Sequence, residues 1–407
     1  MEENETSNLS KKNVIAIVYK DLSLGGVQKK IIDICQGLIE KGYLKVYLIL
    51  TKKSGEFLHV LHPNVKIIDL KVSLTPPFVF SLPLKLWFVF WKIKPDTIFA
   101  LMDTFGCASI MAGMCFPFRQ PKIIVSQNTL ETGFLRQRPW FWFRSLLVRI
   151  FFPFSNTVLT LNNAISIDLI RNFGIPNHKI KMIRNWVSHY SGRDYSLENK
   201  DIDIIYCGRF AIEKNLGLLL ESFKLLLKKR PDSILYLVGY GPEKGFLIKK
   251  AKTLKINGNI VFKKFSFNIR NYLRRTRIFA LTSKTEGTPM AMLEAMSMGI
   301  PVISTNFQGV KEIIDHRISG IIANGKIDIS YWMYKLLSDH TLAENVGLAA
   351  KRIVHSKYNM SNFRKTLDLI SNNGVAGGDG ETPGYKKNKQ RIRRPLSGDN
   401  TYKNKTP

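Results

Sequence analysis

The segment from Leu281 to Ser304 constrains the fold more than any other part of this 407-residue chain. Its sequence, L-T-S-K-T-E-G-T-P-M-A-M-L-E-A-M-S-M-G-I-P-V-I-S, predicts the end of a strand, a tight turn, a short helix and the start of another strand. Thr288 suits the N-cap of that helix and Pro289 its first position, while Gly299 and Pro301 end it. The segment therefore predicts a βαβ unit with a polar turn.

Two glutamates with seven residues between them lie in this unit, Glu286 before the helix and Glu294 within it. A helix N-terminus favours an anion such as a phosphate, which neighbouring carboxylates repel. Carboxylates are better suited to accept hydrogen bonds from neutral hydroxyls, such as those on the ribose and hexose of a nucleotide sugar. The spacing is equally compatible with a solvated turn residue at Glu286 and a surface helix residue at Glu294.

Elsewhere, strand ends carry other polar groups. Arg209 follows the strand D-I-I-Y-C-G-R-F, and Lys214 stands five positions later, before a helix. Two cations that approach one point can neutralise a diphosphate as it departs with developing charge, although in so basic a chain the pair alone is weak support for function. Near the start, Val14 to Val18 predicts a strand, and Gly25-Gly26 predicts a turn whose backbone N–H groups can approach a phosphate.

The composition is globular, with 45% hydrophobic and 23% charged residues, and the length suits two domains of roughly 150 to 200 residues. The net charge of +30 indicates an anionic partner: lipid headgroups, nucleic acid or charged substrates. The four cysteines form no C-x-x-C pair and no cluster with histidines, so neither a zinc site nor a disulfide framework is predicted. We expect a cytoplasmic protein without a secretory signal peptide.

Two segments, Val72 to Lys92 and Phe134 to Phe154, combine aromatic and basic residues. Prolines interrupt the first, which predicts a loop and then a short helix from about Leu84. Both predict segments that lie in a membrane interface, with rings at headgroup depth and arginines such as Arg144 and Arg149 on anionic phosphates. The alternative is a core-packed helix that is rich in aromatic residues.

The motifs resemble a known family. The two glutamates, followed by G-I-P-V-I-S-T, G-V-K-E-I-I-D and S-G-I-I-A, are similar to the signature of the retaining nucleotide-sugar glycosyltransferases of the GT-B fold. The sequence G-R-F-A-I-E-K-N is similar to the diphosphate clamp of that family. The resemblance covers about residues 12 to 370. It implies an α/β fold in which two Rossmann-like domains turn their parallel sheets toward a central cleft, and it implies sugar transfer with retention and without a metal or other cofactor.

The resemblance also implies a domain layout. The N-terminal domain would span residues 1–190 and contain the membrane-interface segments, and a linker would span 191–200. The nucleotide-sugar-binding domain would span 201–355, and a helix over 356–370 would cross back to the first domain. Residues 371–407 contain few apolar residues and predict a disordered basic tail.

Site residues follow from the same resemblance. Arg209 and Lys214 would hold the diphosphate and stabilise the leaving group, Glu286 would face the donor sugar and Glu294 the ribose. The other implied donor contacts are Gly25, Gly26, Gly208, Gly239, Phe265, Gly287, Thr288, Pro289 and Met290.

On the acceptor side, relatives often carry a histidine where this chain has Gln127 and Asn128. An amide does not exchange a proton near neutral pH, so we predict that these two residues orient a substrate, with Asp103 and Glu131 as the nearest carboxylates.

The expected partners are a nucleotide sugar, a lipid-linked glycan acceptor and an anionic membrane surface, with the protein peripheral on the inner face of the cytoplasmic membrane and without nucleic acid. Three alternatives stay open: the same fold acting on a soluble acceptor, a catalytically silent GT-B binding module, and a nucleic-acid-binding protein, which the charge alone would allow.

Overall fold

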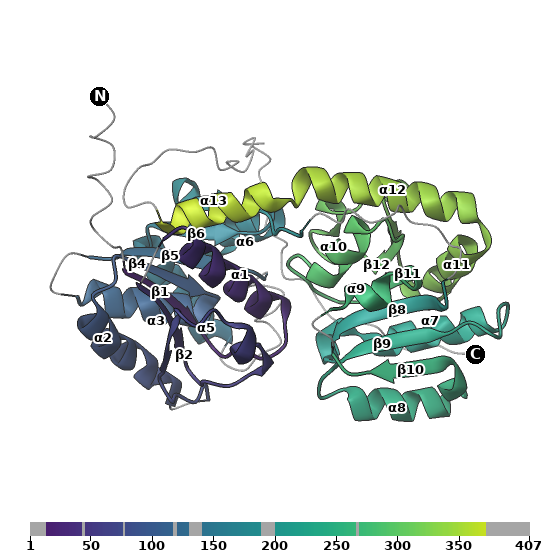
Figure 1. Ribbon diagram of the computed structural model, residues 1–407, viewed down its shortest axis with the longest axis horizontal. Coiled ribbons are helices and arrows are strands. Elements are labelled where there is room, and N and C mark those ends of the chain that lie inside the picture. Colours follow the sequence, from purple (N-terminus) through teal and green to yellow (C-terminus); the bar gives the residue numbers. More distant parts are fainter. Residues whose placement is uncertain are drawn as a thin grey trace, which may run out of the picture.

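The computed structural model describes residues 14–42, 45–75, 78–116, 120–129, 141–188, 200–265 and 268–371. These residues form two domains, each built on one parallel sheet with helices packed against it (Figure 1). Most of the predicted linker, the predicted tail from residue 372 onward and Glu131 lie outside the described residues.

The first domain contains a seven-stranded parallel sheet in the order β3-β2-β1-β4-β5-β6-β7. Alternate residues of the central strand β1 enter different hydrophobic clusters: Ala16 and Val18 pack on the side of α2 and α3, whereas Ile15 and Ile17 pack on the side of α1. Burial on both faces explains why this strand is a continuous apolar run. The elements are β1 (Val14–Tyr19), α1 (Gly26–Glu40), β2 (Lys45–Leu50), β3 (Lys66–Asp69), α2 (Leu82–Ile93), β4 (Thr97–Leu101), α3 (Asp103–Met114), β5 (Lys122–Gln127), α5 (Phe141–Phe151), β6 (Thr157–Thr160), α6 (Asn163–Phe173) and β7 (Ile180–Met182).

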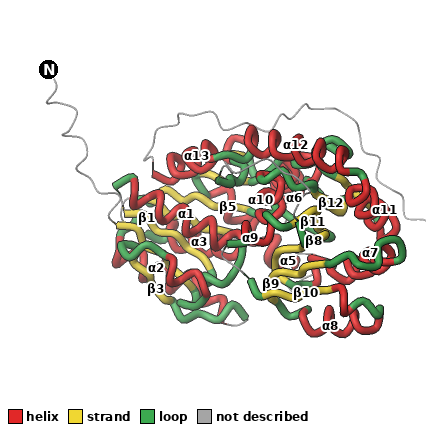
Figure 2. The backbone as a smooth tube through the Cα atoms, turned by 45° about the vertical axis from the view of Figure 1, so that its right-hand side comes forward, coloured by secondary structure: helices red, strands yellow, loops and turns green. Residues whose placement is uncertain are grey.

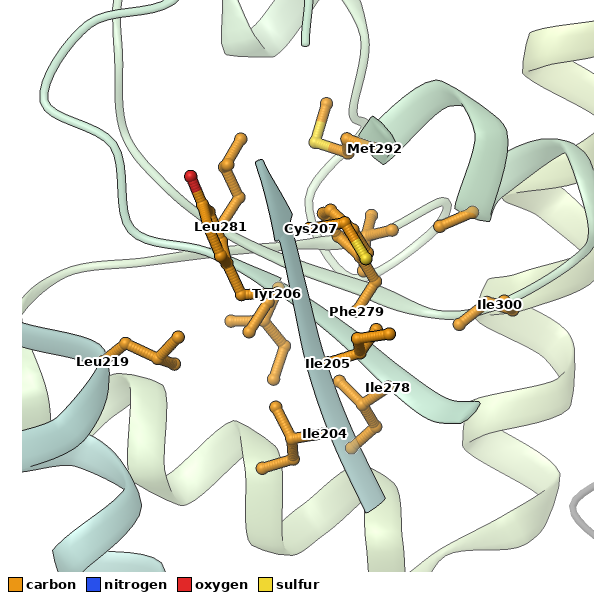
Figure 3. Close-up of a cluster of buried hydrophobic side chains, with 14 of the residues drawn as sticks. Ile204, Ile205, Tyr206, Cys207, Leu219, Ile278, Phe279, Leu281, Met292 and Ile300 are labelled. Carbon is orange, nitrogen blue, oxygen red and sulfur yellow. The ribbon is translucent and has the colours of Figure 1, made fainter. Parts of the chain in front are cut away.

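The second domain contains a six-stranded parallel sheet in the order β10-β9-β8-β11-β12-β13, which repeats the order of the first six strands of the other domain. Residues Ile204 to Cys207 of the central strand β8 are buried among side chains that include Leu219 of α7, Phe279 of β11 and Met292 of α10 (Figure 3). The elements are β8 (Ile202–Arg209), α7 (Leu216–Leu227), β9 (Leu235–Tyr240), α8 (Lys244–Thr253), β10 (Ile260–Lys263), α9 (Arg270–Leu273), β11 (Thr276–Leu281), α10 (Met290–Ser297), β12 (Val302–Thr305), β13 (Ile321–Ala323), α11 (Gly325–Ser338), α12 (His340–Lys357) and α13 (Met360–Ser371).

Both sheets have a topological switch point, at β1/β4 and at β8/β11, where the strand order reverses. In such sheets, the loops at the carboxyl ends of the strands beside the switch point form the binding crevice. These loops and strand ends carry Gly25, Asp103, Arg209 and Glu286. The strand order alone therefore explains why residues far apart in the sequence meet at one place.

Helices α12 and α13 run one after the other along both domains (Figures 1 and 2). Helix α13 packs on α1 of the first domain, and the approach is close because α1 has a glycine at the contact. A Cβ atom on Gly37 would lie 2.5 Å from Cζ of Phe363 and 2.7 Å from Cδ1 of Leu367. Lys41 and Asp368 form an ion pair beside this contact. Helix α13, which follows the second domain in the sequence, is thus packed against the first domain.

Helix α2 has one buried face and one exposed face. Leu82, Leu86 and Phe90 are buried at a helical spacing of four residues, whereas Phe88 and Trp91 are 60% and 43% exposed. The core-packed interpretation of this segment therefore describes the buried face, and the exposed face is available for the interfacial one. None of the helices in the described ranges combines the length and the apolarity that crossing a bilayer requires.

The two arginines predicted to contact phosphates, Arg144 and Arg149, both have acceptors within the protein. Arg149 donates hydrogen bonds to the carbonyl oxygen of Asn172, from Nη2 at 2.8 Å, and Arg144 forms an ion pair with Asp103. Both guanidinium groups therefore already have acceptors within the protein, and a phosphate would bind beside these acceptors or in their place.

Candidate active site

A cavity of about 1340 Å³ lies between the two domains. Its walls come from the carboxyl-end loops of both sheets, from the first turn of α1 and from α10, and all the predicted site residues except Gln127 and Gly239 line it. This volume exceeds the roughly 300–1,000 Å³ that is typical of a site for one small ligand. The cleft is therefore large enough for a nucleotide sugar and part of a second substrate.

The donor loop, defined here as residues 282–289, connects β11 to α10 and lies at the centre of the cleft. The prediction for the start of the helix was wrong by one residue: Met290 is the first helical residue and Pro289 occupies the N-cap. Thr288 does not cap the helix, because its backbone is held toward the first domain, where its carbonyl oxygen accepts a hydrogen bond from Nδ2 of Asn185 at 3.3 Å.

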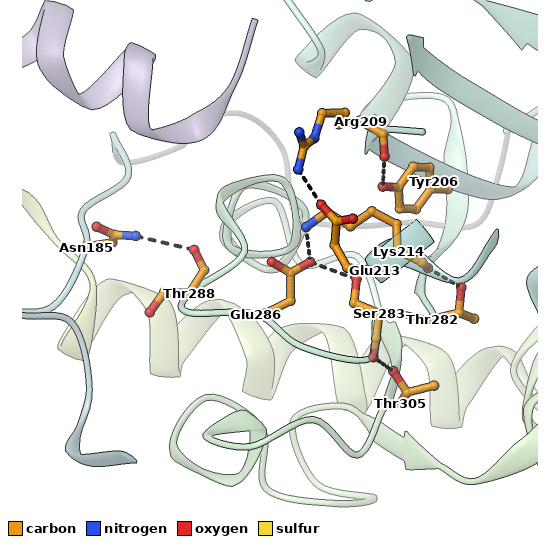
Figure 4. Close-up of polar contacts among 10 residues, drawn as sticks. All are labelled: Asn185, Tyr206, Arg209, Glu213, Lys214, Thr282, Ser283, Glu286, Thr288 and Thr305. Atoms are coloured by element: carbon orange, nitrogen blue, oxygen red, sulfur yellow. Dashed lines mark hydrogen bonds and ion pairs between the residues drawn. The ribbon is translucent and has the colours of Figure 1, made fainter. Parts of the chain in front are cut away.

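Glu286 and Lys214 form an ion pair in the cleft, with 2.6 Å between Oε1 of Glu286 and Nζ of Lys214 (Figure 4). The same carboxylate oxygen accepts a hydrogen bond from Oγ of Ser283 at 2.7 Å. Both charged side chains are mostly buried, at 11% and 19% exposed. Glu286 is therefore a fixed carboxylate with one oxygen already bound by two donors.

A short turn positions Lys214. The 3-10 turn Ile212–Lys214 ends at Asn215, which has a left-handed backbone with φ of 49° that asparagine tolerates better than most residues. Oγ1 of Thr282 donates to the carbonyl oxygens of Lys214 and Asn215 at 3.2 and 3.1 Å. The turn is thus attached to the end of β11, which explains how a lysine on a loop reaches Glu286.

Arg209 stands at the end of β8 and pairs with Glu213 (Figure 4). Its carbonyl oxygen accepts a hydrogen bond from the hydroxyl of Tyr206 at 3.0 Å. Burial raises the pKa of Tyr206 well above its ordinary value, so the hydroxyl keeps its proton and donates. The Arg209 side chain as a whole is 51% exposed. Arg209 therefore combines a fixed backbone with a side chain that can exchange one anionic partner for another.

Glu294 faces the first domain and pairs with Lys29 of α1 across the cleft. Four further hydrogen bonds join the domains. The hydroxyl of Tyr240 donates to the carbonyl oxygen of Leu24 at 2.8 Å. Nδ2 of Asn162 donates to the carbonyl oxygen of Gly287 at 2.8 Å, and the carboxylate of Glu312 accepts from the first two N–H groups of α6 at 3.0 and 3.1 Å. The two domains are thus in direct polar contact around the donor loop.

The predicted glycines have different roles. A Cβ atom on Gly287 would lie 1.8 Å from the carbonyl oxygen of Asn128, so this glycine lets the donor loop touch the first domain. Gly26 faces Met290, whose Cγ would lie 3.1 Å from an added Cβ. Gly239 is outside the cleft wall. Its φ is 156°, and an added Cβ would lie 1.9 Å from the carbonyl oxygen of Gly208. This glycine therefore allows the ends of β8 and β9 to approach each other.

Only one of the two predicted amides reaches the cleft. Asn128 lines it, whereas Gln127 is fully buried and its Nε2 donates to the carbonyl oxygen of Thr129 at 3.1 Å. Asp103 lines the cleft at the first turn of α3, and its Oδ2 accepts from Nε of Arg144 at 3.0 Å. The acceptor side of the cleft thus presents an amide and a carboxylate that is already paired with a guanidinium.

Several charged residues of the cleft were missing from the prediction, among them Asp21 and Lys29. Burial opposes ionisation of Asp21, but the hydrogen bonds that Ser23 donates hold the pKa of its carboxyl below the ordinary value. Lys29 comes three residues after Gly26 in the first turn of the helix that follows the switch-point strand. That position in the sequence could have identified Lys29 as a cleft residue, because first-turn residues of this helix face the crevice in doubly wound sheets.

Lys30 is a buried cation at the contact between the domains. Its Nζ donates to Oδ1 of Asn185 at 3.2 Å and lies 4.9 Å from the centre of the Trp186 ring. Asn185 in turn holds the backbone of Thr288 in the donor loop. Burial lowers the pKa of Lys30 from 10.5 to about 7. Lys30 is therefore a structural support of the donor loop whose charge changes near neutral pH.

We expect stability to rise with pH because of Lys30. The unfolded chain holds this proton up to about pH 10.5, whereas the folded protein loses it near pH 7, so the unfolded state binds more protons in between. The free energy of unfolding of the native protein, relative to that of Lys30→Met, should increase by about 1.4 kcal/mol per pH unit between these values. Denaturant unfolding at several pH values measures it, with Lys224→Met, at an exposed lysine of α7, as the control. Parallel curves for native protein and Lys30→Met would contradict this assignment.

The two domains, their strand orders and the cleft define a GT-B architecture, and sequence comparisons agree. The model for Glycosyltransferase Family 4 matches residues 24–189, and the model for Glycosyl transferases group 1 matches residues 192–353. The chain belongs to the GT-B glycosyltransferases. Its first domain is of the family 4 type and its second domain of the group 1 type.

Curated relatives match parts of the chain. An uncharacterized glycosyltransferase of Haemophilus influenzae is 35% identical over 127 residues, which are 31% of this chain and 35% of that protein. The chitobiosyldiphosphodolichol beta-mannosyltransferase of Candida albicans is 21% identical over 324 residues, 71% of each chain. Other strong matches cover only 54% and 57% of the relatives' own length, so the chain spans about half of most of these proteins.

Solved structures share the fold. HepE of Anabaena, in complex with UDP and glucose, superposes with a TM-score of 0.70 at 16% sequence identity, covering 88% of this chain and 99% of that one.

Proposed function

We propose that this protein transfers a sugar from a nucleotide-sugar donor to a lipid-linked glycan acceptor, with retention of anomeric configuration. The observation that carries this proposal is the convergence of Arg209, Lys214, Glu286 and Glu294 in one cleft between two Rossmann-like domains. The mannosyltransferase relative, whose name denotes a dolichol-linked acceptor, is consistent with a lipid-linked acceptor, and the UDP and glucose bound by HepE are consistent with a nucleotide-sugar donor.

On the donor side, the diphosphate would replace carboxylates as the partner of the two cations. Arg209 is half exposed and pairs with Glu213, so a phosphate can take the place of that carboxylate. Lys214 would add a second positive charge as the leaving diphosphate develops negative charge. The two side chains would take the part that a metal ion has in other transferases, so we propose transfer without a metal.

Glu286 would orient the donor sugar. One carboxylate oxygen is bound by Lys214 and Ser283, which leaves the other to accept a hydrogen bond from a sugar hydroxyl. Glu294 would accept from the ribose in the same way, once the donor displaces Lys29 from its carboxylate. Closure of the domains around the donor loop would exclude water and hold the two substrates in reacting geometry.

On the acceptor side, exposed apolar residues of the first domain support a peripheral position on a membrane. Trp142 and Leu146 of α5 are 82% and 51% exposed, and Leu84 and Phe88 of α2 are 59% and 60% exposed. Large rings and aliphatic chains at this exposure are typical of an interfacial surface. The net charge of +30 would attract this surface to anionic lipid.

The experiment that tests this function supplies radiolabelled UDP-, GDP-, ADP- and TDP-sugars to the purified protein together with bacterial membrane lipid. One donor should pass its label to the organic phase, and Arg209→Ala should abolish that transfer. Label that accumulates only in water-soluble glycan would contradict the lipid-linked acceptor, and no transfer to any acceptor would contradict the enzyme activity.

The membrane surface is tested separately by flotation with vesicles of phosphatidylglycerol and phosphatidylcholine. We expect the native protein to float and Phe88→Ser/Trp142→Ser to lose most of this binding, about fivefold or more, because two exposed rings no longer enter the interface. Ile327→Ser, at a residue that is 74% exposed on α11 of the second domain, is the matched control and should float like the native protein. Equal loss in both variants would contradict a specific membrane surface.

A further inference from the structure

One end of the cleft differs chemically from the donor side. It lies within the first domain, between the start of α2, one face of α3 and one face of α5. Its wall consists of apolar side chains, which we call the apolar arm: Leu74, Phe80, Leu82, Met111, Phe143 and Leu147. Apolar walls favour a hydrocarbon over a glycan, because sugar hydroxyls that are buried there would lose hydrogen bonds to water without new partners. A hydrocarbon chain has no such cost.

The arm reaches the protein surface. Phe80 and Phe143 line the cleft, yet they are 57% and 40% exposed, and their rings lie 5.9 Å apart in an edge-to-face arrangement. Phe80 stands just before α2 and Phe143 stands in the first turn of α5, so both are carried by the elements that bear the exposed apolar surface. The two rings therefore stand where the cleft passes into that surface.

A cation adjoins the residues of the arm. Arg144 lines the cleft on the same helix as Phe143 and Leu147, and its side chain is 23% exposed. Its Nη2 also donates to Oγ1 of Thr104 at 3.1 Å, besides the ion pair with Asp103. A guanidinium between an apolar arm and a polar cleft is suited to the phosphate that links a hydrocarbon chain to a sugar.

We propose that the apolar arm binds the phosphate-proximal part of the acceptor's hydrocarbon chain, with Arg144 at the phosphate. This inference rests on the proposed function and adds that the enzyme recognises the hydrocarbon chain of the acceptor as well as its glycan. The rest of the chain would leave between Phe80 and Phe143 into the membrane. The chain is either isoprenoid or unbranched acyl, and both present the same hydrocarbon to the arm.

The test measures binding by equilibrium dialysis, with soluble probes below their micelle concentrations: farnesyl phosphate, dodecyl phosphate and inorganic phosphate. Farnesyl phosphate should bind the native protein, and Phe80→Ser/Phe143→Ser should weaken this binding about tenfold, because two rings that contact the chain are removed. Phe88→Ser/Trp142→Ser removes two rings that are also exposed but lie outside the cleft, and it should change this binding less than about twofold. Met111→Gln, inside the arm, is a second variant that should weaken binding in the same sense.

Each result is decisive. Stronger binding of farnesyl than of dodecyl phosphate would assign the arm to isoprenoids, and equal binding would assign it to any hydrocarbon chain; both support the arm. Equal weakening by the two serine pairs, or competition by inorganic phosphate at the same concentration, would overturn it. Failure of the proposed function is distinguishable, because it would appear as farnesyl phosphate binding without sugar transfer from any nucleotide sugar.

Discussion

Replacing Arg209 with alanine is expected to lower kcat/KM for sugar transfer by two to three orders of magnitude. Loss of one preorganised hydrogen-bond donor to a developing negative charge typically lowers the rate about 10²- to 10³-fold. Arg209 is suited to that part because a buried tyrosine fixes its backbone while its side chain is half exposed. Steady-state kinetics on the donor identified in the screen measures the effect.

Lys224→Ala is the control for this prediction, because Lys224 is an exposed cation of the same domain outside the cleft. It should transfer sugar at the native rate. An Arg209→Ala enzyme that retains more than a third of native activity would show that the diphosphate is neutralised elsewhere.

Glu286→Gln is expected to lower kcat about 10- to 100-fold, because a charge-assisted hydrogen bond of about 1.5–3 kcal/mol to the sugar is lost. The substitution keeps the shape of the side chain while it removes the negative charge that pairs with Lys214. The variant should still bind the donor, so kcat should fall more than the donor KM rises. Single-turnover kinetics with saturating donor measures the change.

Glu213→Gln is a matched comparison, for which we expect stronger donor binding and no loss of kcat. Glu213 pairs with Arg209 and would compete with the diphosphate for it, so removal of this charge should leave kcat close to native and lower the donor KM. If both glutamine variants lose kcat equally, Glu286 has no distinct role toward the sugar and the loss reflects the charge balance of the cleft.

The donor-side residues could be predicted because they belong to two short motifs that resemble those of a known family. Glu286 and Glu294 lie on one loop and the helix that follows it, and Arg209 and Lys214 lie five residues apart. Local spacing therefore determines where these side chains point. Thr288 shows the limit of this reasoning, because a hydrogen bond from Asn185, 103 residues away, decides the conformation of the loop before the helix.

The acceptor side could be predicted only in part. Successive side chains of a strand point in opposite directions, so only one of Gln127 and Asn128 can face the cleft, but the sequence does not say which. Asp103 was predicted without its partner, because Arg144 comes from a helix 41 residues away that was interpreted as facing lipid. The pairing depends on how α5 packs on α3, which no local pattern determines.

The ion pairs across the cleft were beyond prediction for the same reason. Lys29 and Glu294 are 265 residues apart and meet only because the two domains approach each other. In the aromatic segments, the composition indicated that rings are exposed, but the helical period determines which ones are. Phe90 is buried, whereas Phe88 is exposed.

The central claim is that the cleft binds a nucleotide sugar through Arg209 and Lys214. The most direct measurement is the melting temperature of the native protein and of Arg209→Ala with UDP-, GDP-, ADP- and TDP-sugars, because a ligand that binds the folded state stabilises it by mass action. We predict that one donor raises the melting temperature of the native protein and leaves that of Arg209→Ala unchanged. An equal rise in both proteins, or no rise with any donor in the presence of anionic lipid, would contradict the claim.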